Sequence, residues 1–420
     1  MSAGAAHPRA LWSLAHQLWL CPFRPFFGLA ALSAWLLMAL WAGFLLLGWP
    51  LPAVPGGPFV WHAHELLLGF ALAAAAGFVL TSVPEFTRTP AFAAAPVRVL
   101  VALWLLARLG FWSSGWWPRA GLVVAGLAQL ALLLGLMALL APRLWQDPDR
   151  RHVSFLWALA VLALLGTGFY VDALRGVAPM RWLHALLGAW MALIVIAMSR
   201  ISMSIVNASI DEVVAREGGE RDPYLARPPR RNLALLAIGL YAAAEFRQPG
   251  GRVSAWLALA AAAAVLGLLN DWHVGRPLMR RWPLMLYAVY ALMAAGYALI
   301  GVGLLGGGFS PNAGLHVLTV GALGLAIFVV ICIAGYTHSG LEKDGRPWVP
   351  WGAALLVAAA LLRAAAYAGS TELLMGLAAL LWCAAFAVQS TFMLPVFLRP
   401  RADGASDCAG LDEAPLPGLP

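Results

Sequence analysis

Residues 61–90 read WHAHELLLGFALAAAAGFVLTSVPEFTRTP, and this stretch decides how the chain folds. It begins with two histidines and a glutamate, runs without charge to Thr81, and ends in a polar turn at Glu85 and Arg88. A helix from His62 to Thr81 would rise roughly 30 Å, which is the hydrocarbon thickness of a bilayer. The stretch therefore predicts a membrane-spanning helix with ligand-type side chains at the end where it enters the membrane.

Glu65 is the only Asp, Glu, Lys or Arg between Pro25 and Pro84. A charged side chain at membrane depth is costly, so it usually has a partner and a function. On a helix Glu65 shares a face with His62, and the spacing predicts that its carboxylate orients that imidazole through a hydrogen bond. His62 and His64 are about 200° apart on a helix, so both cannot face one metal unless the first turn is unwound.

The composition places the chain in a membrane. Of its 420 residues, 62% are hydrophobic and 11% are charged, and the mean hydropathy is +0.81. A soluble domain is roughly a quarter charged. The net charge of +8 comes from Arg residues on loops rather than from a basic patch, so a lipid bilayer is the expected partner and nucleic acid is not.

Neither the cysteines nor the N-terminal residues show a recognisable pattern of their own. The four cysteines show no paired spacing, which argues against a disulfide framework or a structural zinc site; they are Cys21, Cys332, Cys383 and Cys408. The apolar stretch at residues 11–20 is interrupted by His16 and Gln17 and lacks a small-residue cleavage site, so no cleavable signal peptide is expected.

Hydropathy predicts an all-α, polytopic bundle of about twelve transmembrane helices. The predicted spans are Phe27–Gly48, His62–Val83, Val97–Trp112, Ala120–Ala141, His152–Val171, Trp182–Val206, Asn232–Phe246, Val253–Trp272, Pro283–Leu305, Leu315–Thr337, Val349–Ala368 and Glu372–Leu398. The seventh span is short and contains Glu245. Residues 1–402 are expected to form one membrane domain, of which 1–26 is a cytoplasmic or interfacial segment. Residues 403–420 are expected to form a short disordered tail.

Basic residues set the expected orientation. With a cytoplasmic N-terminus, nineteen Arg and Lys residues fall on the cytoplasmic side of the predicted spans. Five fall on the opposite side, namely Arg119, Arg175, Arg181, Arg247 and Arg252. This bias follows the positive-inside rule, so both termini are predicted to be cytoplasmic.

The same topology brings four histidines to the outer face, from three helices that are distant in sequence. They are His62, His64, His184 and His316. Neutral imidazole is the common ligand of haem and copper, so these histidines together with Glu65 predict an outer-face cofactor or metal site. Arg181 lies one turn before His184, where it suits a haem propionate or another anionic group. Each histidine taken alone is also explained as an interfacial side chain bonded to a carbonyl or a lipid headgroup.

Further polar membrane residues are predicted toward the inner face, and they are Arg24, Glu85, Arg88, Arg200 and His338. A solvated loop explains most of them. Arg200 is the exception, because it lies in an otherwise apolar helix among Ser199, Ser202 and Ser204.

Three motifs carry a resemblance to a known family. They are Phe23-Arg24-Pro25-Phe26-Phe27, the WHAHE…GF…LTSVPEFT stretch, and HVLTVGALG at residues 316–324. The chain thereby resembles the NnrS family, bacterial haem- and copper-containing membrane proteins linked to the nitric oxide response, and the resemblance extends over most of its length. The chain departs from the family at the end of the tenth span. There the family usually has a Thr-Arg pair before a Gly-His-Thr-Gly-Arg turn, whereas residues 331–340 read ICIAGYTHSG.

The resemblance implies a multi-pass protein of the bacterial inner membrane that binds haem and copper, has nitric oxide as a possible ligand, and protects against nitrosative stress. It also implies that the outer histidine set is retained, while the inner face is altered because His338 is present without the family's Arg. The residues do not indicate whether a substrate is turned over. The alternative is a proton-coupled transporter of a small solute or metal ion, with the outer histidines as its entry site and Glu65 as its proton-coupled group. A haem-copper oxidase core is less favoured, since the deep histidine pairs that it needs in mid-membrane are absent.

Overall fold

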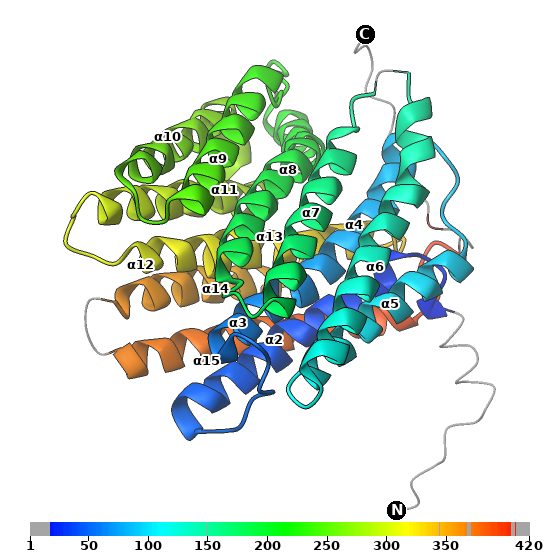
Figure 1. The fold of residues 1–420 in the computed structure, drawn as a ribbon. Coiled ribbons are helices and arrows are strands. Elements are labelled where there is room, and N and C mark those ends of the chain that lie inside the picture. Colours follow the sequence, from blue (N-terminus) through cyan, green and yellow to red (C-terminus); the bar gives the residue numbers. More distant parts are fainter. Residues whose placement is uncertain (1–16, 149, 344, 368–370, 405–407, 409–420) are drawn as a thin grey trace, which may run out of the picture.

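The computed structural model describes residues 17–148, 150–343, 345–367, 371–404 and 408. Within these residues all regular structure is helical, so the all-α prediction is confirmed (Figure 1). Residues 1–16 of the predicted N-terminal segment, Ala368 at the end of the eleventh span, and most of the predicted tail lie outside the described residues. The helices are α2 (Phe23–Leu47), α3 (Gly57–His64), η1 (Glu65–Phe70), α4 (Ala71–Phe86), α5 (Ala94–Ser113), α6 (Pro118–Gln146), α7 (Ser154–Leu174), α8 (Met180–Glu217), α9 (Pro228–Arg247), α10 (Arg252–Leu269), η2 (Asn270–Trp272), η3 (Arg276–Met279), α11 (Arg281–Leu304), α12 (Pro311–His316), η4 (Val317–Leu323), α13 (Gly324–Thr337), α14 (Trp348–Ala365) and α15 (Thr371–Leu398).

Eleven helical stretches in the described chain are long and apolar enough to cross a membrane, and the protein is therefore a multi-pass membrane protein. The remaining predicted span, the seventh, corresponds to α9, which is a helix of 20 residues but carries charged residues near both of its ends. Each of the twelve predicted spans therefore coincides with a long helical stretch of the structure. α9 is the one predicted span that is less apolar than the others, and it is not among the eleven stretches that could cross a membrane.

Proline and glycine mark where these helices begin and end. Pro118, Pro228 and Pro311 each occupy a first-turn position, where a missing N–H is tolerated. Gly48 follows α2 with φ of 69°, a left-handed conformation that glycine adopts at low cost. The Ser310 side chain accepts a hydrogen bond from the Asn312 N–H and so caps the start of α12. These local signals cut the apolar chain into separate spans.

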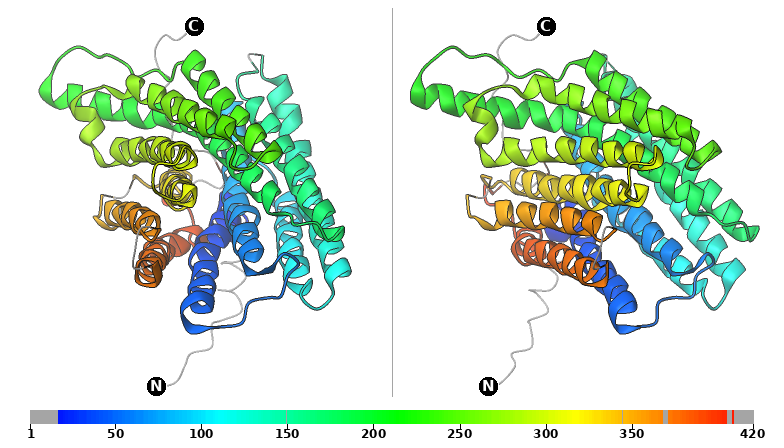
Figure 2. Two further views of the ribbon diagram at one scale, coloured as in Figure 1. Left: turned by 60° about the vertical axis from the view of Figure 1, so that its left-hand side comes forward. Right: turned by 90° about the vertical axis from the view of Figure 1, so that its left-hand side faces the viewer.

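Most helices that are consecutive in sequence pack side by side, and the last helix, α15, packs against α2 near the start of the chain (Figure 2). The two spans at the centre of the bundle are Gly57–Phe86 and Pro311–Thr337. In their most apolar 18-residue windows, 94% and 83% of the residues are buried. Because α2, α8, α11 and α14 pack against these two spans, the helix that opens with His62 and His64 lies at the centre of the fold.

Both central spans change from α to π geometry directly after their histidines. The π-helix η1 follows α3 at Glu65, and the π-helix η4 follows α12 at Val317. Single π turns inside α-helices are rare and occur mostly at functional sites. The two π-helices thus indicate a functional site at the end of the bundle where the predicted histidines lie.

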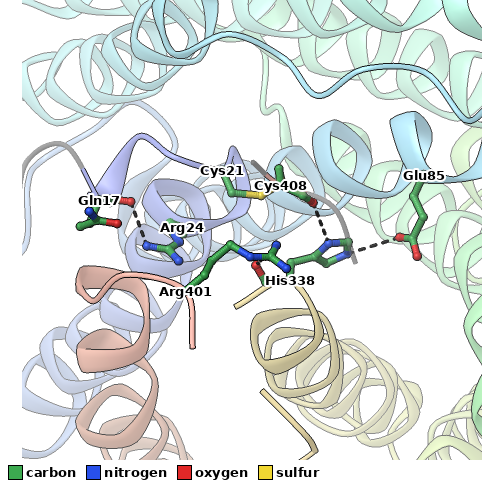
Figure 3. The surroundings of a disulfide bond; sticks show 7 residues. All are labelled: Gln17, Cys21, Arg24, Glu85, His338, Arg401 and Cys408. Atoms are coloured by element: carbon green, nitrogen blue, oxygen red, sulfur yellow. Dashed lines mark hydrogen bonds and ion pairs between the residues drawn. A yellow bond between two sulfur atoms is a disulfide. The ribbon is translucent and has the colours of Figure 1, made fainter. Parts of the chain in front are cut away.

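The expectation that the cysteines do not pair is wrong for two of the four. Cys21, just before α2, is disulfide-bonded to Cys408, whereas Cys332 and Cys383 are free (Figure 3). The two bonded cysteines are 387 residues apart. No local spacing could reveal this pair, because the packing of α15 against α2 brings the two ends of the chain together.

Arg24 holds the same two chain ends together. Its side chain is buried and donates hydrogen bonds to the backbone carbonyls of Gln17, Phe397 and Arg399. Arg401 likewise donates to the carbonyl of His338, which ties the C-terminal segment to the end of α13. Of the polar membrane residues that the sequence suggested, Arg24 therefore has a structural role.

Candidate functional site

Three of the four predicted outer histidines line one cavity, which we call the histidine cavity. His62 comes from α3, His184 from α8 and His316 from α12. The cavity has a volume of about 410 Å³, and most of its other lining residues are apolar. The topology argument thus brought together side chains that are far apart in sequence, and the fold places all three around the same space.

The His62 and His184 rings have ring nitrogens that are open to a ligand. The His62 ring stacks on the Trp41 indole, with 4.2 Å between ring centroids and 18° between ring planes. This contact orients the imidazole but uses none of its hydrogen-bonding capacity. Among the described residues, no hydrogen-bond partner is found for either ring, and an unbonded imidazole nitrogen beside a cavity can coordinate a metal.

The His316 ring is held by a hydrogen bond within its own helix. Its Nδ1 lies 2.8 Å from the backbone carbonyl oxygen of Asn312. A carbonyl can only accept, so Nδ1 carries the proton and Nε2 keeps its lone pair. This arrangement is typical of metal-ligating histidines, where the second nitrogen sets the tautomer and the orientation of the ring.

Arg363 is a cavity residue that the sequence analysis missed. It lies in α14, its Nη2 donates to the Tyr367 hydroxyl at 3.0 Å, and that hydroxyl lies 3.4 Å from His316 Nδ1. The Arg363 Nη1 is buried without a hydrogen-bond partner in the part of the chain that the structure describes. An unpaired buried N–H is costly, so this guanidinium is suited to an acceptor that a ligand brings.

Arg181, which the sequence placed beside a haem propionate, does not line the histidine cavity. Its side chain is exposed and forms an ion pair with Asp172, at 2.7 Å between Nη2 and Oδ2. The Trp182 indole donates to the same carboxylate oxygen. In the histidine cavity, the side chain suited to pair with an anionic group is Arg363 rather than Arg181.

His64 and Glu65 point away from the histidine cavity. His64 Nδ1 lies 3.0 Å from Glu65 Oε1, and His64 Nε2 lies 2.8 Å from the Tyr170 hydroxyl. The His64 ring also stacks on Phe111, with 3.5 Å between centroids. Because both of its ring nitrogens are engaged, His64 differs from the three cavity histidines.

Glu65 is bound to Arg108 from α5, a second residue that the sequence analysis missed. Arg108 Nη1 donates to Glu65 Oε1 at 2.7 Å, and the Trp112 indole donates to Glu65 Oε2 at 2.9 Å. The other guanidinium nitrogen, Nη2, donates to Gln129. The predicted pairing of Glu65 with His62 is wrong, because the charge that Glu65 requires is supplied by α5 on the opposite side of the helix.

The three cavity histidines are not gathered around a single ion. Within the described ranges, no group of three His, Cys, Asp or Glu side chains is placed to hold a metal ion. Histidines that share one metal must bring their nitrogens to about 2.1 Å from it. The cavity volume of about 410 Å³ leaves room for a group larger than one ion.

Apart from Arg24, the predicted inner-face residues separate into two kinds. Arg200, His338 and Glu85 line a second cavity of about 290 Å³, which we call the inner cavity. Arg88 is exposed just beyond α4, has φ of 51°, and does not line this cavity. Arg88 thus fits the solvated-loop interpretation, whereas the other three enclose a space.

Comparison with known proteins adds one match. A family model described as NnrS protein matches residues 17–401, which is most of the chain. No curated protein matches it.

Proposed function

The chain belongs to the NnrS family, and from this premise we propose that it binds haem and copper in the bacterial inner membrane and serves in the response to nitric oxide. The observation that carries the proposal is the histidine cavity, where His62, His184 and His316 face one space with ring nitrogens available. Such nitrogens are the usual protein ligands of both haem iron and copper.

The cavity suits a haem in size, polarity and charge. Its volume of about 410 Å³ lies within the range of roughly 300–1,000 Å³ that is usual for cofactor pockets. Its walls are largely apolar, as a porphyrin requires, and the buried Arg363 Nη1 is free to pair with a propionate. Bound haem iron would supply an open coordination position for a diatomic ligand such as nitric oxide.

The protein's own residues have separable roles in this site. The imidazoles of His62, His184 and His316 are the candidate ligands, and any histidine not used by the haem is available to copper. The stacked Trp41 and the Asn312 carbonyl hold two of these rings in place. Arg363 and Tyr367 form the polar edge of the cavity.

The alternative, a proton-coupled transporter, receives less support. Its proton-coupled group was to be Glu65, yet this carboxylate is engaged by Arg108 and Trp112 outside the cavity. A third cavity, of about 60 Å³, borders the histidine cavity at Leu323 and the inner cavity at Phe78, and its lining is apolar and aromatic. Transporters of ions or polar solutes carry polar groups near mid-membrane, so this lining favours the cofactor-binding proposal.

The test is to purify His62→Ala, His184→Ala and His316→Ala proteins and to measure the haem absorption band and the copper content. Each variant is expected to lose haem, copper or both relative to the unaltered chain. His273→Ala is the matched control, because that histidine is exposed and does not line the cavity. A colourless, copper-free protein from haem- and copper-replete cells would refute the proposal, as would three variants with unchanged content.

A further inference from the structure

The inner cavity, to which family membership assigns no role, contains two cationic side chains. Arg200 extends into it from α8, and Lys343 lies at its exposed rim after α13. Among the described residues neither side chain forms an ion pair. Arg200 Nη2 donates a hydrogen bond to the Arg151 backbone carbonyl at 3.2 Å.

An arginine in this position calls for a counter-charge. The helix α8 is one of the spans that are apolar enough to cross the membrane, and Arg200 is half-buried within it. Charged side chains in membrane spans are costly and almost always pair with an opposite charge, a backbone carbonyl or water. One carbonyl bond leaves most of the guanidinium's five N–H donors to be satisfied.

Glu85 does not provide that counter-charge, although it is the only acidic residue among the described residues of the lining. Its Oε2 lies 3.3 Å from Nε2 of His338, and Nδ1 of the same ring lies 3.2 Å from the Cys408 carbonyl oxygen (Figure 3). The carboxylate thus already has a partner, fixed at the junction of the two chain ends. The described lining residues thus comprise two cations and one engaged carboxylate, which is a positive excess.

A buried hydroxyl completes the set of donors. Thr81, from α4, is 4% exposed and lines the inner cavity. Its Oγ1 has no hydrogen-bond partner in the portion of the chain described. A buried polar atom without a partner is unfavourable unless a water or a ligand occupies the neighbouring space.

We propose that the inner cavity is a binding site for a small oxyanion, held by Arg200 and Lys343 and hydrogen-bonded by the Thr81 hydroxyl. The planar guanidinium pairs with carboxylate and phosphate oxygens through two parallel hydrogen bonds. The volume of about 290 Å³ suits a ligand at the small end of the usual range. A free anion and the phosphodiester of an anionic lipid share this chemistry.

The experiment uses the purified full chain in a neutral detergent. Inorganic phosphate and acetate are titrated at constant ionic strength, and the midpoint of thermal unfolding is followed. In parallel, the protein is reconstituted with phosphatidylglycerol or phosphatidylcholine, and retained lipid is measured by native mass spectrometry. A saturable rise with a free anion identifies a soluble ligand, whereas selective retention of phosphatidylglycerol identifies the lipid.

Arg200→Gln is expected to weaken the observed binding at least tenfold, since it removes a charge-assisted contact. Arg119→Gln is the matched control, because this arginine is exposed on α6 and lies outside the inner cavity. If Arg200→Gln does not fold, Lys343→Gln at the exposed rim takes its place and should also weaken binding. The proposal is overturned if neither anion nor lipid binds, or if Arg119→Gln weakens binding equally. None of these readouts depends on haem or copper.

Discussion

Replacing Arg108 by Leu should destabilise the protein by about 3–5 kcal/mol, the usual cost of removing one partner from a buried ion pair. Arg108 Nη1 and Glu65 Oε1 are 2.7 Å apart, and the two side chains are only 9% and 2% exposed. In the variant the Glu65 carboxylate remains buried and keeps its contacts with Trp112 and His64. Its charge is then no longer balanced, because neither of these contacts supplies a full positive charge.

The size of the loss follows from burial rather than from the contact distance. Arg216 and Glu212 are also 2.7 Å apart, but their side chains are 64% and 46% exposed. Exposed pairs one turn apart on a helix contribute roughly 0.3–0.5 kcal/mol. Arg216→Leu is therefore the matched control, and it should change the free energy of unfolding by less than about 1 kcal/mol.

The assay is denaturant unfolding in detergent micelles, followed by tryptophan fluorescence. The double variant Glu65→Gln with Arg108→Gln should lose less stability than Arg108→Leu, because it removes both charges while the amide oxygen introduced in place of the carboxylate still accepts from the Trp112 indole. Since this pair lies outside the histidine cavity, Glu65→Gln should also retain its haem and copper. A loss below about 1 kcal/mol for Arg108→Leu would refute the reasoning.

Three further predictions follow from the histidine cavity and from the joined chain ends. Arg363→Leu should lower haem retention about tenfold while Arg119→Leu does not, as measured by absorbance after prolonged dialysis. Cys21→Ser should lower the free energy of unfolding by about 2–4 kcal/mol, and reductant should abolish its difference from the unaltered chain. A reporter that is active only in the periplasm, fused after Arg401, should be silent, and an active fusion would reverse the predicted orientation.

The fold was predictable because hydropathy alone reports span length, and lipid allows few structures other than helices. α9 illustrates the limit of that signal. Arg230, Arg231, Glu245 and Arg247 lie near its ends, so its apolar centre is shorter than a bilayer requires. The Cys21–Cys408 bond was not predictable, since it depends on the packing of α15 against α2 rather than on any spacing.

The site was partly predictable because consecutive spans alternate in direction. The starts of the second, sixth and tenth spans therefore fall on one face, which is why His62, His184 and His316 could be grouped. The same rule puts the end of the eleventh span on that face, so Arg363 could have been found as the single charge in an apolar helix. The alternation of spans does not predict the direction in which a side chain points around its helix. For this reason the predicted pairing of Glu65 with His62 was wrong.

Rotation around the helix also explains how His62 and His64, two residues apart, come to serve different neighbours. A step of two residues turns a helix by about 200°, so one ring faces the histidine cavity while the other faces α5 and α7. The π turn begins at Glu65, directly after His64, and the Glu65 carboxylate lies on the Arg108 side. Substitution at His62 should therefore act on the cofactor, whereas substitution at His64 should act on stability. Both nitrogens of the His64 ring are already engaged, by Glu65 and by Tyr170. The candidate ligands that join His62 therefore come from α8 and α12 rather than from His64.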